Sequence, residues 1–221
     1  LNGIKVLEFS GIGPGPYCGM LLADLGADVI RLSRVSEKGT HNKFDIHNRS
    51  KRTIVADLKN PKATKEIKKL IHEVDVLFEG FRPGVMEKLG LSPEECFKLN
   101  KSLVYGRMTG WGQDGPMSNQ AGHDINYISL SGALNAIGDQ NSNPSITLNL
   151  VGDYGGGGMM LAMGILAGVI SSSKTGKGQV IDSAMIDGSL SLMSFFYSLK
   201  EMGIWKDTRK SNFLDGAAHF Y

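Results

Sequence analysis

The feature of this sequence that most constrains its fold is the alternation of short apolar runs with helical patterns between residues 4 and 108. Each run has the length and the β-branched content of a buried strand. The runs cover Ile4–Phe9, Ala27–Leu32, Thr53–Asp57, Val74–Phe78 and Leu103–Met108. Because strands that alternate with helices pair in parallel and carry helices on both faces, the pattern predicts an α/β fold with a mainly parallel sheet.

Helical patterns fill the gaps between these strands and continue in the less regular second half. In the first half we expect helices at Tyr17–Leu25, from the Asn60-Pro61 cap to Glu73, and from the Ser92 capping box to Leu99. In the second half we expect helices at Asp124–Leu134, Leu161–Ile170 and Met185–Met202, and a short strand at Gln179–Ser183. No repeat or linker divides the chain, so residues 1–221 are predicted to form one domain or most of one.

Composition excludes several classes of protein. Hydrophobic residues make up 41%, charged residues 21%, and the net charge is +2, which is typical of a globular protein and not of a nucleic-acid-binding arm. The two cysteines lack metal-ligand spacing, so we expect no metal site and a reducing compartment. The apolar run Met159–Ile170 has 12 residues, whereas a membrane span needs about 20. It is therefore predicted to be a core helix, and no membrane partner is expected.

A glycine-rich loop follows the first predicted strand, where a dinucleotide fingerprint would lie. The third glycine of that fingerprint is replaced by Pro16, and Ser33 and Arg34 stand where a ribose-binding acid is expected. A nicotinamide cofactor is therefore disfavoured. A tight strand-to-helix turn explains the loop by itself, and Arg34 suits a phosphorylated adenosine ligand.

His123 stands where a polar, glycine-containing loop gives way to a predicted helix, with Asp124 as the expected N-cap. A helix N-terminus disfavours the imidazolium form, so a histidine there is biased toward the neutral form that accepts a proton. His123 is a candidate base on this argument, and the alternative is a purely structural residue at the loop-to-helix junction.

Asp153 precedes four consecutive glycines, at residues 155–158, that open the predicted core helix. Its simplest role is an N-cap of that helix. Four glycines exceed what capping requires, and they leave backbone N–H groups bare enough to hold an oxyanion or to admit a thioester carbonyl. Asp153 is therefore a candidate for both capping and chemistry.

Several motifs together resemble the family III CoA-transferases over essentially the whole chain. These motifs are Gly3–Glu8 with Gly13–Pro16, Leu22–Val29, Glu79–Val85, Gly110–Gln113 and Gly176–Gln179. The segments Gly122–Tyr127 and Asn149–Asp153 resemble the α-methylacyl-CoA racemase branch in particular. The resemblance implies a Rossmann-like large domain, a smaller domain beyond Tyr221 that this chain lacks, and an interlocked homodimer.

The resemblance also implies site residues. It matches His123 and Asp153 to the acid/base pair of the racemase branch, with no metal and no redox cofactor. It places CoA contacts at Arg34, Val55, Ala56, Asp57, Leu58, Gly122, Asp124, Ile125, Asn126 and Tyr127, and further ones at Ile12, Arg82 and Lys88. In that family, a glutamate that supports the catalytic histidine lies beyond the position of Tyr221.

The expected function is racemisation of 2-methylacyl-CoA thioesters, by removal of the α-proton from one face and return of a proton to the other. For that role the pKa of Asp153 must lie above its usual value of about 3.9. Two alternatives remain open at this point: a CoA-transferase with Asp153 as nucleophile, and an inactive CoA-binding fragment. We expect a bacterial cytoplasmic protein, or a peroxisomal or mitochondrial one if the source is eukaryotic.

Overall fold

A computed structural model describes residues 1–37 and 42–220 of the chain. Its sheet has the strand order β3-β2-β1-β4-β5-β6, and every pairing is parallel. The strands are β1 (Lys5–Phe9), β2 (Asp28–Ser33), β3 (Lys51–Val55), β4 (Val76–Glu79), β5 (Val104–Thr109) and β6 (Gln179–Ala184). The predicted parallel α/β sheet is confirmed, and β6 is the strand expected near residue 179.

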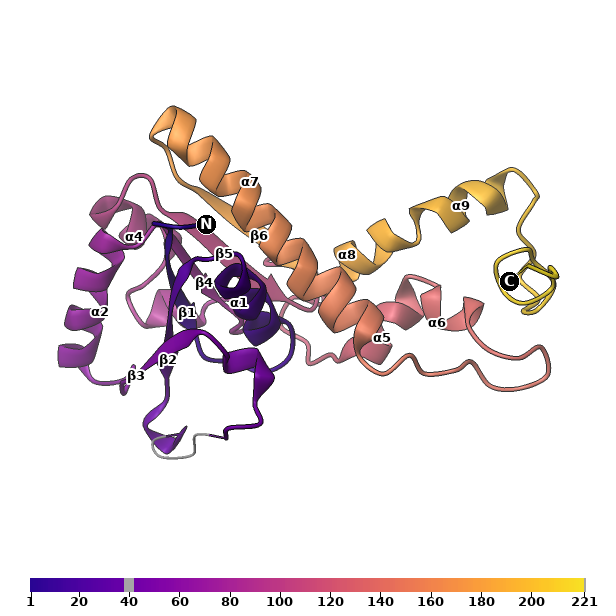
Figure 1. Cartoon of the computed structure of the whole chain (residues 1–221), viewed down its shortest axis with the longest axis horizontal. Coiled ribbons are helices and arrows are strands. Elements are labelled where there is room, and N and C mark those ends of the chain that lie inside the picture. The colour runs from indigo at the N-terminus through magenta and orange to yellow at the C-terminus, as the bar shows by residue number, and fades with distance from the viewer. Residues whose placement is uncertain (38–41, 221) are drawn as a thin grey trace.

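Helices connect the strands and extend beyond them (Figure 1). The α-helices are α1 (Pro14–Asp24), α2 (Pro61–Glu73), α3 (Val85–Lys88), α4 (Pro93–Leu99), α5 (Asp124–Leu130), α6 (Ala133–Ala136), α7 (Met160–Thr175), α8 (Met185–Leu192) and α9 (Ser194–Glu201). Two short 3₁₀ turns, η1 (Val35–Glu37) and η2 (Ile46–Asn48), and a π-helix, η3 (Leu150–Met159), complete the described elements.

The strand order places a crevice between β1 and β4. The chain moves outward from β1 through β2 to β3 and then returns to β4 on the other side of β1. The loops that follow β1 and β4 therefore lead away from each other at the carboxyl edge of the sheet. In open α/β sheets this reversal is where ligands bind.

Both faces of the sheet are buried, as a parallel sheet requires. Val6 and Leu7 on β1 are both fully buried, and they belong to separate cores on opposite faces. Val6 shares its core with Leu22 of α1 and Ile165 of α7, whereas Leu7 shares its core with Ile71 of α2. Full burial of a side chain of this size contributes about 1.5–3 kcal/mol, so these two cores fix α1 and α7 on one face and α2 on the other.

Four helices differ from the sequence-based prediction, and one of them is α7, which extends to Thr175 and not to the expected Ile170. The helix expected over 124–134 ends before Gly132, whose φ of 78° is left-handed, and α6 begins after it. The long helix expected over 185–202 is divided at Met193 into α8 and α9. The first helix begins at Pro14, three residues earlier than expected, because the fixed φ of proline suits the first turn of a helix.

The glycine-rich segment after residue 150 is a π-helix, so the helical stretch that the glycines were predicted to open begins earlier than expected, at Leu150. η3 continues into α7 and gives one helical stretch, Leu150–Thr175, of 26 residues. By length and composition alone it is long and apolar enough to cross a membrane, and it is the one such helix among residues 1–37 and 42–220. Core helices pass the same test. Leu161 and Ile165 of this stretch are buried in the core on the sheet, which favours the predicted core helix.

An arm leads away from the sheet. Figure 1 shows α8 and α9 continuing from the end of β6 to the far side of the molecule, with α5 and α6 beneath them and the C-terminus at the tip. A smaller core joins these helices and includes Ile128 of α5, Ala133 of α6 and Met193. The sheet lobe and the arm meet at α5, which follows His123, and at η3, which contains Asp153.

Helix α7 contacts the sheet closely because glycines face it. A Cβ atom on Gly164 would lie 2.6 Å from Cγ2 of Ile181, and one on Gly168 would lie 2.8 Å from Cγ1 of Val104. Real Cβ atoms essentially never approach other atoms so closely. The two glycines therefore set the distance between α7 and strands β5 and β6.

Gly168→Val is expected to lower the free energy of unfolding by about 1–3 kcal/mol, because the added side chain overfills the contact with Val104. The control Ala167→Val introduces the same β-branched side chain at an exposed position of the same helix, and it should cost less than about 1 kcal/mol. Urea unfolding of both variants measures the difference. Equal losses of stability would contradict the packing role of Gly168.

Candidate active site

One cleft of about 680 Å³ lies at the carboxyl edge of the sheet, at the reversal between β1 and β4. The loop after β1 lines it with residues 10–15, the loop after β4 with residues 80–83, and the end of β5 with residues 108–111. His123 and Asp153 both line this cleft. The structure thus brings together two candidate residues that lie 30 positions apart in the sequence (153 minus 123).

His123 is the N-cap residue of α5, the position that the sequence analysis assigned to Asp124. Its backbone N–H donates a hydrogen bond of 2.9 Å to Oδ1 of Asn126, three residues into the helix. His123 has extended backbone geometry and is exposed, so its ring is free to face the cleft. The prediction of Asp124 as N-cap was wrong by one residue, because Asn126 closes the turn onto His123.

Asp153 lies inside the first turns of η3, and Asn149 holds the N-cap position expected for Asp153. The capping prediction for Asp153 was therefore wrong. Its own backbone N–H donates a hydrogen bond of 2.8 Å to Oδ2 of Asp124. Because Asp124 directly follows His123, this bond ties the two candidate residues to each other.

Gly152 makes this contact possible. A Cβ atom at that position would lie 2.7 Å from Oδ2 of Asp124, so any other residue would push the carboxylate away from the Asp153 N–H. The side chain of Asp124 is buried, and its Oδ1 has no hydrogen-bond partner among the described residues. Asp124 therefore lies beneath the cleft and does not line it.

The four glycines at residues 155–158 have a packing role that the sequence analysis missed. A Cβ atom on Gly156 would lie 2.8 Å from the backbone nitrogen of Ser189, and one on Gly158 would lie 2.8 Å from the carbonyl oxygen of Pro14. Their backbones pack against α8 on one side and α1 on the other. They lie within η3 and not at an open helix end, so the expected oxyanion site at these N–H groups was wrong.

Burial raises the pKa of Asp153, and the negative charge of Asp124 raises it further. Two effects oppose this shift: a hydrogen bond of 3.5 Å from Nδ2 of Asn149 to Oδ2 of Asp153, and the charge interaction with His123. The net direction is upward. Asp153 therefore holds its proton to a higher pH than an ordinary aspartate, which suits a proton donor.

Tyr127 forms a wall of the cleft together with Trp111. Their rings meet edge to face, with centroids 4.8 Å apart. Gly110 and Gly122 make room for the tyrosine, because a Cβ atom on either would lie within 3 Å of its hydroxyl. Burial, followed by the charges of Asp153 and Asp124, raises the pKa of Tyr127 to about 12. Tyr127 therefore stays protonated and presents a neutral hydroxyl to the site.

The residues predicted to contact CoA fall into three groups. Ile12, Arg34, Arg82, Gly122 and Tyr127 line the main cleft. Leu58 and Lys88 line a neighbouring cleft of about 570 Å³, and Val55, Ala56 and Asp57 lead to it from the end of β3. Asp124, Ile125 and Asn126 line neither cleft.

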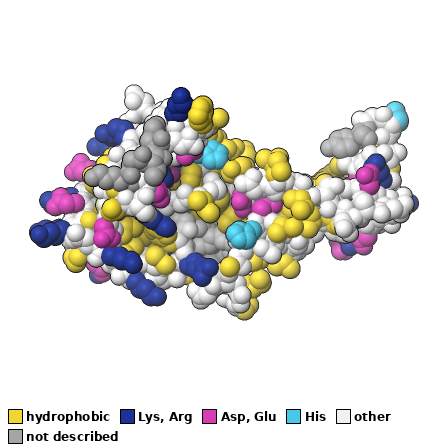
Figure 2. All heavy atoms as spheres, turned by 90° about the horizontal axis from the view of Figure 1, so that it is seen from below, with side chains coloured by type: hydrophobic (Ala, Val, Ile, Leu, Met, Phe, Trp, Pro, Cys, Tyr) yellow, Lys and Arg dark blue, Asp and Glu magenta, His cyan; other side chains and the backbone are white. Residues whose placement is uncertain are grey.

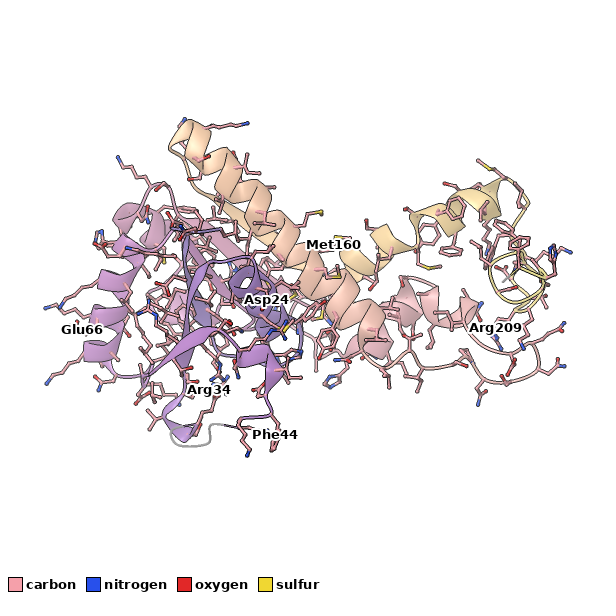
Figure 3. The ribbon with its side chains drawn as sticks, in the orientation of Figure 1. Asp24, Arg34, Phe44, Glu66, Met160 and Arg209 are labelled. Atoms are coloured by element: carbon pink, nitrogen blue, oxygen red, sulfur yellow. The ribbon has the colours of Figure 1, made fainter. Side chains whose placement is uncertain are left out.

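Positive charge gathers near both clefts. The guanidinium carbon of Arg34 lies 6.0 Å from the ring centre of Phe81, which holds the charge at the main cleft. Lys59, Lys65 and Lys68 line the neighbouring cleft with Lys88. Figure 2 shows that basic side chains gather over the sheet lobe more than over the arm, and Figure 3 shows Arg34 on that lobe, far from Arg209. This lobe is suited to a ligand with several phosphates.

Some residues that line the main cleft were not predicted as site residues. Ser10, Glu37, Phe81 and Asn149 line the main cleft, and none of them was predicted as a site residue. Their positions at the ends of β1, β2 and β4 and at the start of η3 are the signal that a strand-end search would use. No group of three or more metal-binding side chains occurs in the described part of the chain.

Comparison with known proteins gives the class to which this fold and site belong. The model of CoA-transferase family III matches residues 1–219, and the chain belongs to that family. Among curated relatives, alpha-methylacyl-CoA racemase from Mus musculus is 45% identical over 221 residues, and the protein of the same name from Homo sapiens is 45% identical over 223 residues. The resemblance to the racemase branch is confirmed.

The chain spans little more than half the length of these relatives. Each racemase alignment covers 100% of this chain and 57% of the relative. Succinyl-CoA:glutarate CoA-transferase from Homo sapiens is more distant, at 33% identity over 207 residues, 88% of this chain and 47% of the relative.

Solved structures agree on the fold. A CAIB/BAIF family protein from Brucella suis superposes with a TM-score of 0.83 at 29% identity, over 91% of this chain and 57% of that protein. Rv3272 from M. tuberculosis superposes with a TM-score of 0.81 at 30% identity, over 91% of this chain and 58% of that protein. The predicted fold class is confirmed by both.

Asp124→Asn is expected to lower the pKa of Asp153 toward its ordinary value. The amide oxygen still accepts the Asp153 N–H, but the negative charge that raises the pKa is gone. A carboxyl-carbon NMR titration measures the shift, with Asp28→Asn as a control because Asp28 pairs with Arg52 on the surface. An unchanged or higher pKa in Asp124→Asn would contradict the electrostatic role of Asp124.

Proposed function

We propose that this chain carries the acid/base residues of an α-methylacyl-CoA racemase. The observation that carries the proposal is the pair formed by His123 and Asp153, which line one cleft and are joined through Asp124. The 45% identity to two curated racemases supports it. The substrate class is a 2-methylacyl-CoA thioester, and no metal or redox cofactor is assigned a step.

The reaction needs one base and one acid on opposite sides of the α-carbon. In the S-to-R direction, neutral His123 removes the α-proton and an enolate forms. Protonated Asp153 then donates its proton to the opposite face, and the two residues exchange roles from the R substrate. The raised pKa of Asp153 supports its part, because a carboxyl group that holds its proton to a higher pH than usual is a better candidate for the acid.

The enolate oxygen needs hydrogen-bond donors. A donor of this kind contributes roughly 3 kcal/mol to stabilisation of the transition state.

The CoA moiety is assigned to the basic side of the sheet lobe. Arg34 and Arg82 lie at the mouth of the main cleft, and Leu58 and Lys88 line the neighbouring one. A phosphorylated adenosine bound at these basic residues directs the pantetheine chain of CoA toward His123. The proposal includes an interlocked homodimer for a version of this chain extended to the length of the relatives.

The pairing of a histidine with the aspartate favours racemisation over CoA transfer. A nucleophilic aspartate needs no base on the opposite face of the α-carbon, whereas proton transfer between two faces does. The curated transferase is also less similar to the chain, at 33% identity, than the racemases are. The two functions differ in whether deuterium from solvent enters the α-carbon.

The test is incubation of S-2-methylacyl-CoA in D₂O with this chain and with a version extended to the length of the relatives. NMR of the α-carbon follows label entry with no second carboxylic acid present. Racemisation predicts deuterium at the α-carbon in at least the longer version. Transfer of CoA to an added acid without any label would identify a CoA-transferase and overturn the proposal. If both versions bind CoA and neither reaction occurs, only the alternative of an inactive CoA-binding scaffold remains.

His123→Ala is expected to slow deuterium entry from the S substrate by about 10²–10⁴-fold, the range for loss of a general base. The affinity for CoA itself should stay within about twofold, since the assigned CoA contacts are unchanged. Calorimetry with CoA provides the second readout. A large loss of affinity with exchange preserved would show that His123 binds CoA and does not transfer the proton.

A further inference from the structure

A fully buried ion pair lies under the first turn of α1 and is not among the residues that line the cleft. Glu8 on β1 and Lys51 on β3 are joined by a contact of 2.6 Å between Oε2 and Nζ, and neither side chain is exposed. Burial raises the pKa of Glu8 to about 7, although the charge of Lys51 opposes this shift. Buried pairs of this kind add little net stability compared with apolar residues of the same volume, so stability alone does not explain the pair.

The fold makes space for this pair. A Cβ atom on Gly19, within α1, would lie 2.0 Å from Oε2 of Glu8 and 2.8 Å from Nζ of Lys51. A glycine inside a helix is less favourable than alanine. Helix α1 therefore includes an unfavourable residue directly over these two charges.

Lys51 also reaches the backbone of α1. Its Nζ donates a hydrogen bond of 2.9 Å to the carbonyl oxygen of Pro16. Pro14 and Pro16 have no N–H to donate, and the first N–H groups of a helix have no acceptor within it in any case. The N–H of Tyr17 reaches the carbonyl of Gly13 at 3.3 Å. Lys51 thus supplies this turn with a side-chain hydrogen bond from outside the helix.

That turn is in direct contact with the helix that carries Asp153. A Cβ atom on Gly13 would lie 3.4 Å from Oδ2 of Asp153, and one on Gly158 would lie 2.8 Å from the carbonyl oxygen of Pro14. Gly13 and Pro14 also line the cleft. A shift of the turn by a few tenths of an ångström would therefore move the surroundings of the Asp153 carboxyl group.

We propose that Lys51, held in place by Glu8, is a positioning residue that fixes the first turn of α1 against η3 and so sets the position of Asp153. The effect on substrate exchange rests on the proposed function, whereas the effect on the turn does not. Neither Glu8 nor Lys51 lines the cleft, so the proposal predicts a change in the rate of proton transfer without a change in CoA binding.

The test replaces the pair by apolar residues of similar size, Glu8→Leu with Lys51→Met, which removes both charges and the bond to Pro16. Glu8→Gln with Lys51→Met serves the same purpose if leucine does not fit. Lys51→Arg is the matched control, because it keeps a cation and a donor. Urea unfolding shows that each variant is folded, and NMR hydrogen exchange of the Tyr17 amide reports the turn.

In the apolar double variant, the Tyr17 amide should exchange at least about tenfold faster than in the original protein, although the midpoint of unfolding changes little. The kcat for deuterium entry into substrate should fall at least about tenfold with KM unchanged. Lys51→Arg should retain most of the Tyr17 protection and most of the kcat. Unchanged Tyr17 protection in a folded double variant would overturn the proposal. If the original protein does not exchange substrate, the proposed function fails, and the Tyr17 measurement still decides the role of Lys51.

Discussion

The hydrogen bond from the backbone N–H of Asp153 to the carboxylate of Asp124 is the interaction on which the site depends. It joins the start of α5 to the start of η3, and these two helices come from separate parts of the chain. Because Asp124 follows His123 directly, the bond holds the backbone of Asp153 close to the start of the helix that His123 caps. Burial raises the pKa of Asp153, and the charge of the same carboxylate raises it further, so Asp124 contributes to both the position and the proton affinity of Asp153.

Glycine packing is the second constraint. η3 passes between α1 and α8 so closely that side chains at Gly156 and Gly158 would strike the neighbouring backbones. Gly152 admits the Asp124 carboxylate in the same way. The glycine-rich segment thus serves to place the Asp153 helix between two others at the edge of the sheet, where the strand order opens the cleft.

The sheet could be predicted from the sequence because its signals are local. Strand length, β-branched content and the Asn60-Pro61 cap need no knowledge of the rest of the fold, and α2 begins and ends where the pattern predicts. The division of the later helices could not be predicted so well. Gly132 and Met193 interrupt patterns that remain apolar on one face, and the packing of the arm decides the break.

The site was predicted in part, for similar reasons. His123 and Asp153 are recognisable from their neighbours in the sequence, but the cap positions were wrong: Asn126 closes the turn onto His123, and η3 begins at Leu150 with Asn149 as its N-cap. The carboxylate of Asp124 and the buried pair of Glu8 and Lys51 depend on residues that are distant in the sequence. Only the folded chain brings these groups together.

The central claim is that two different groups act on opposite faces of one carbon. The most direct measurement follows a single enantiomer of 2-methylacyl-CoA in D₂O during the first few per cent of reaction and records deuterium separately in the remaining substrate and in the inverted product. Two groups acting from opposite faces predict that deuterium appears in the product while the remaining substrate keeps its protium. Equal deuterium in both enantiomers from the start would show that one group serves both faces, and would contradict this account.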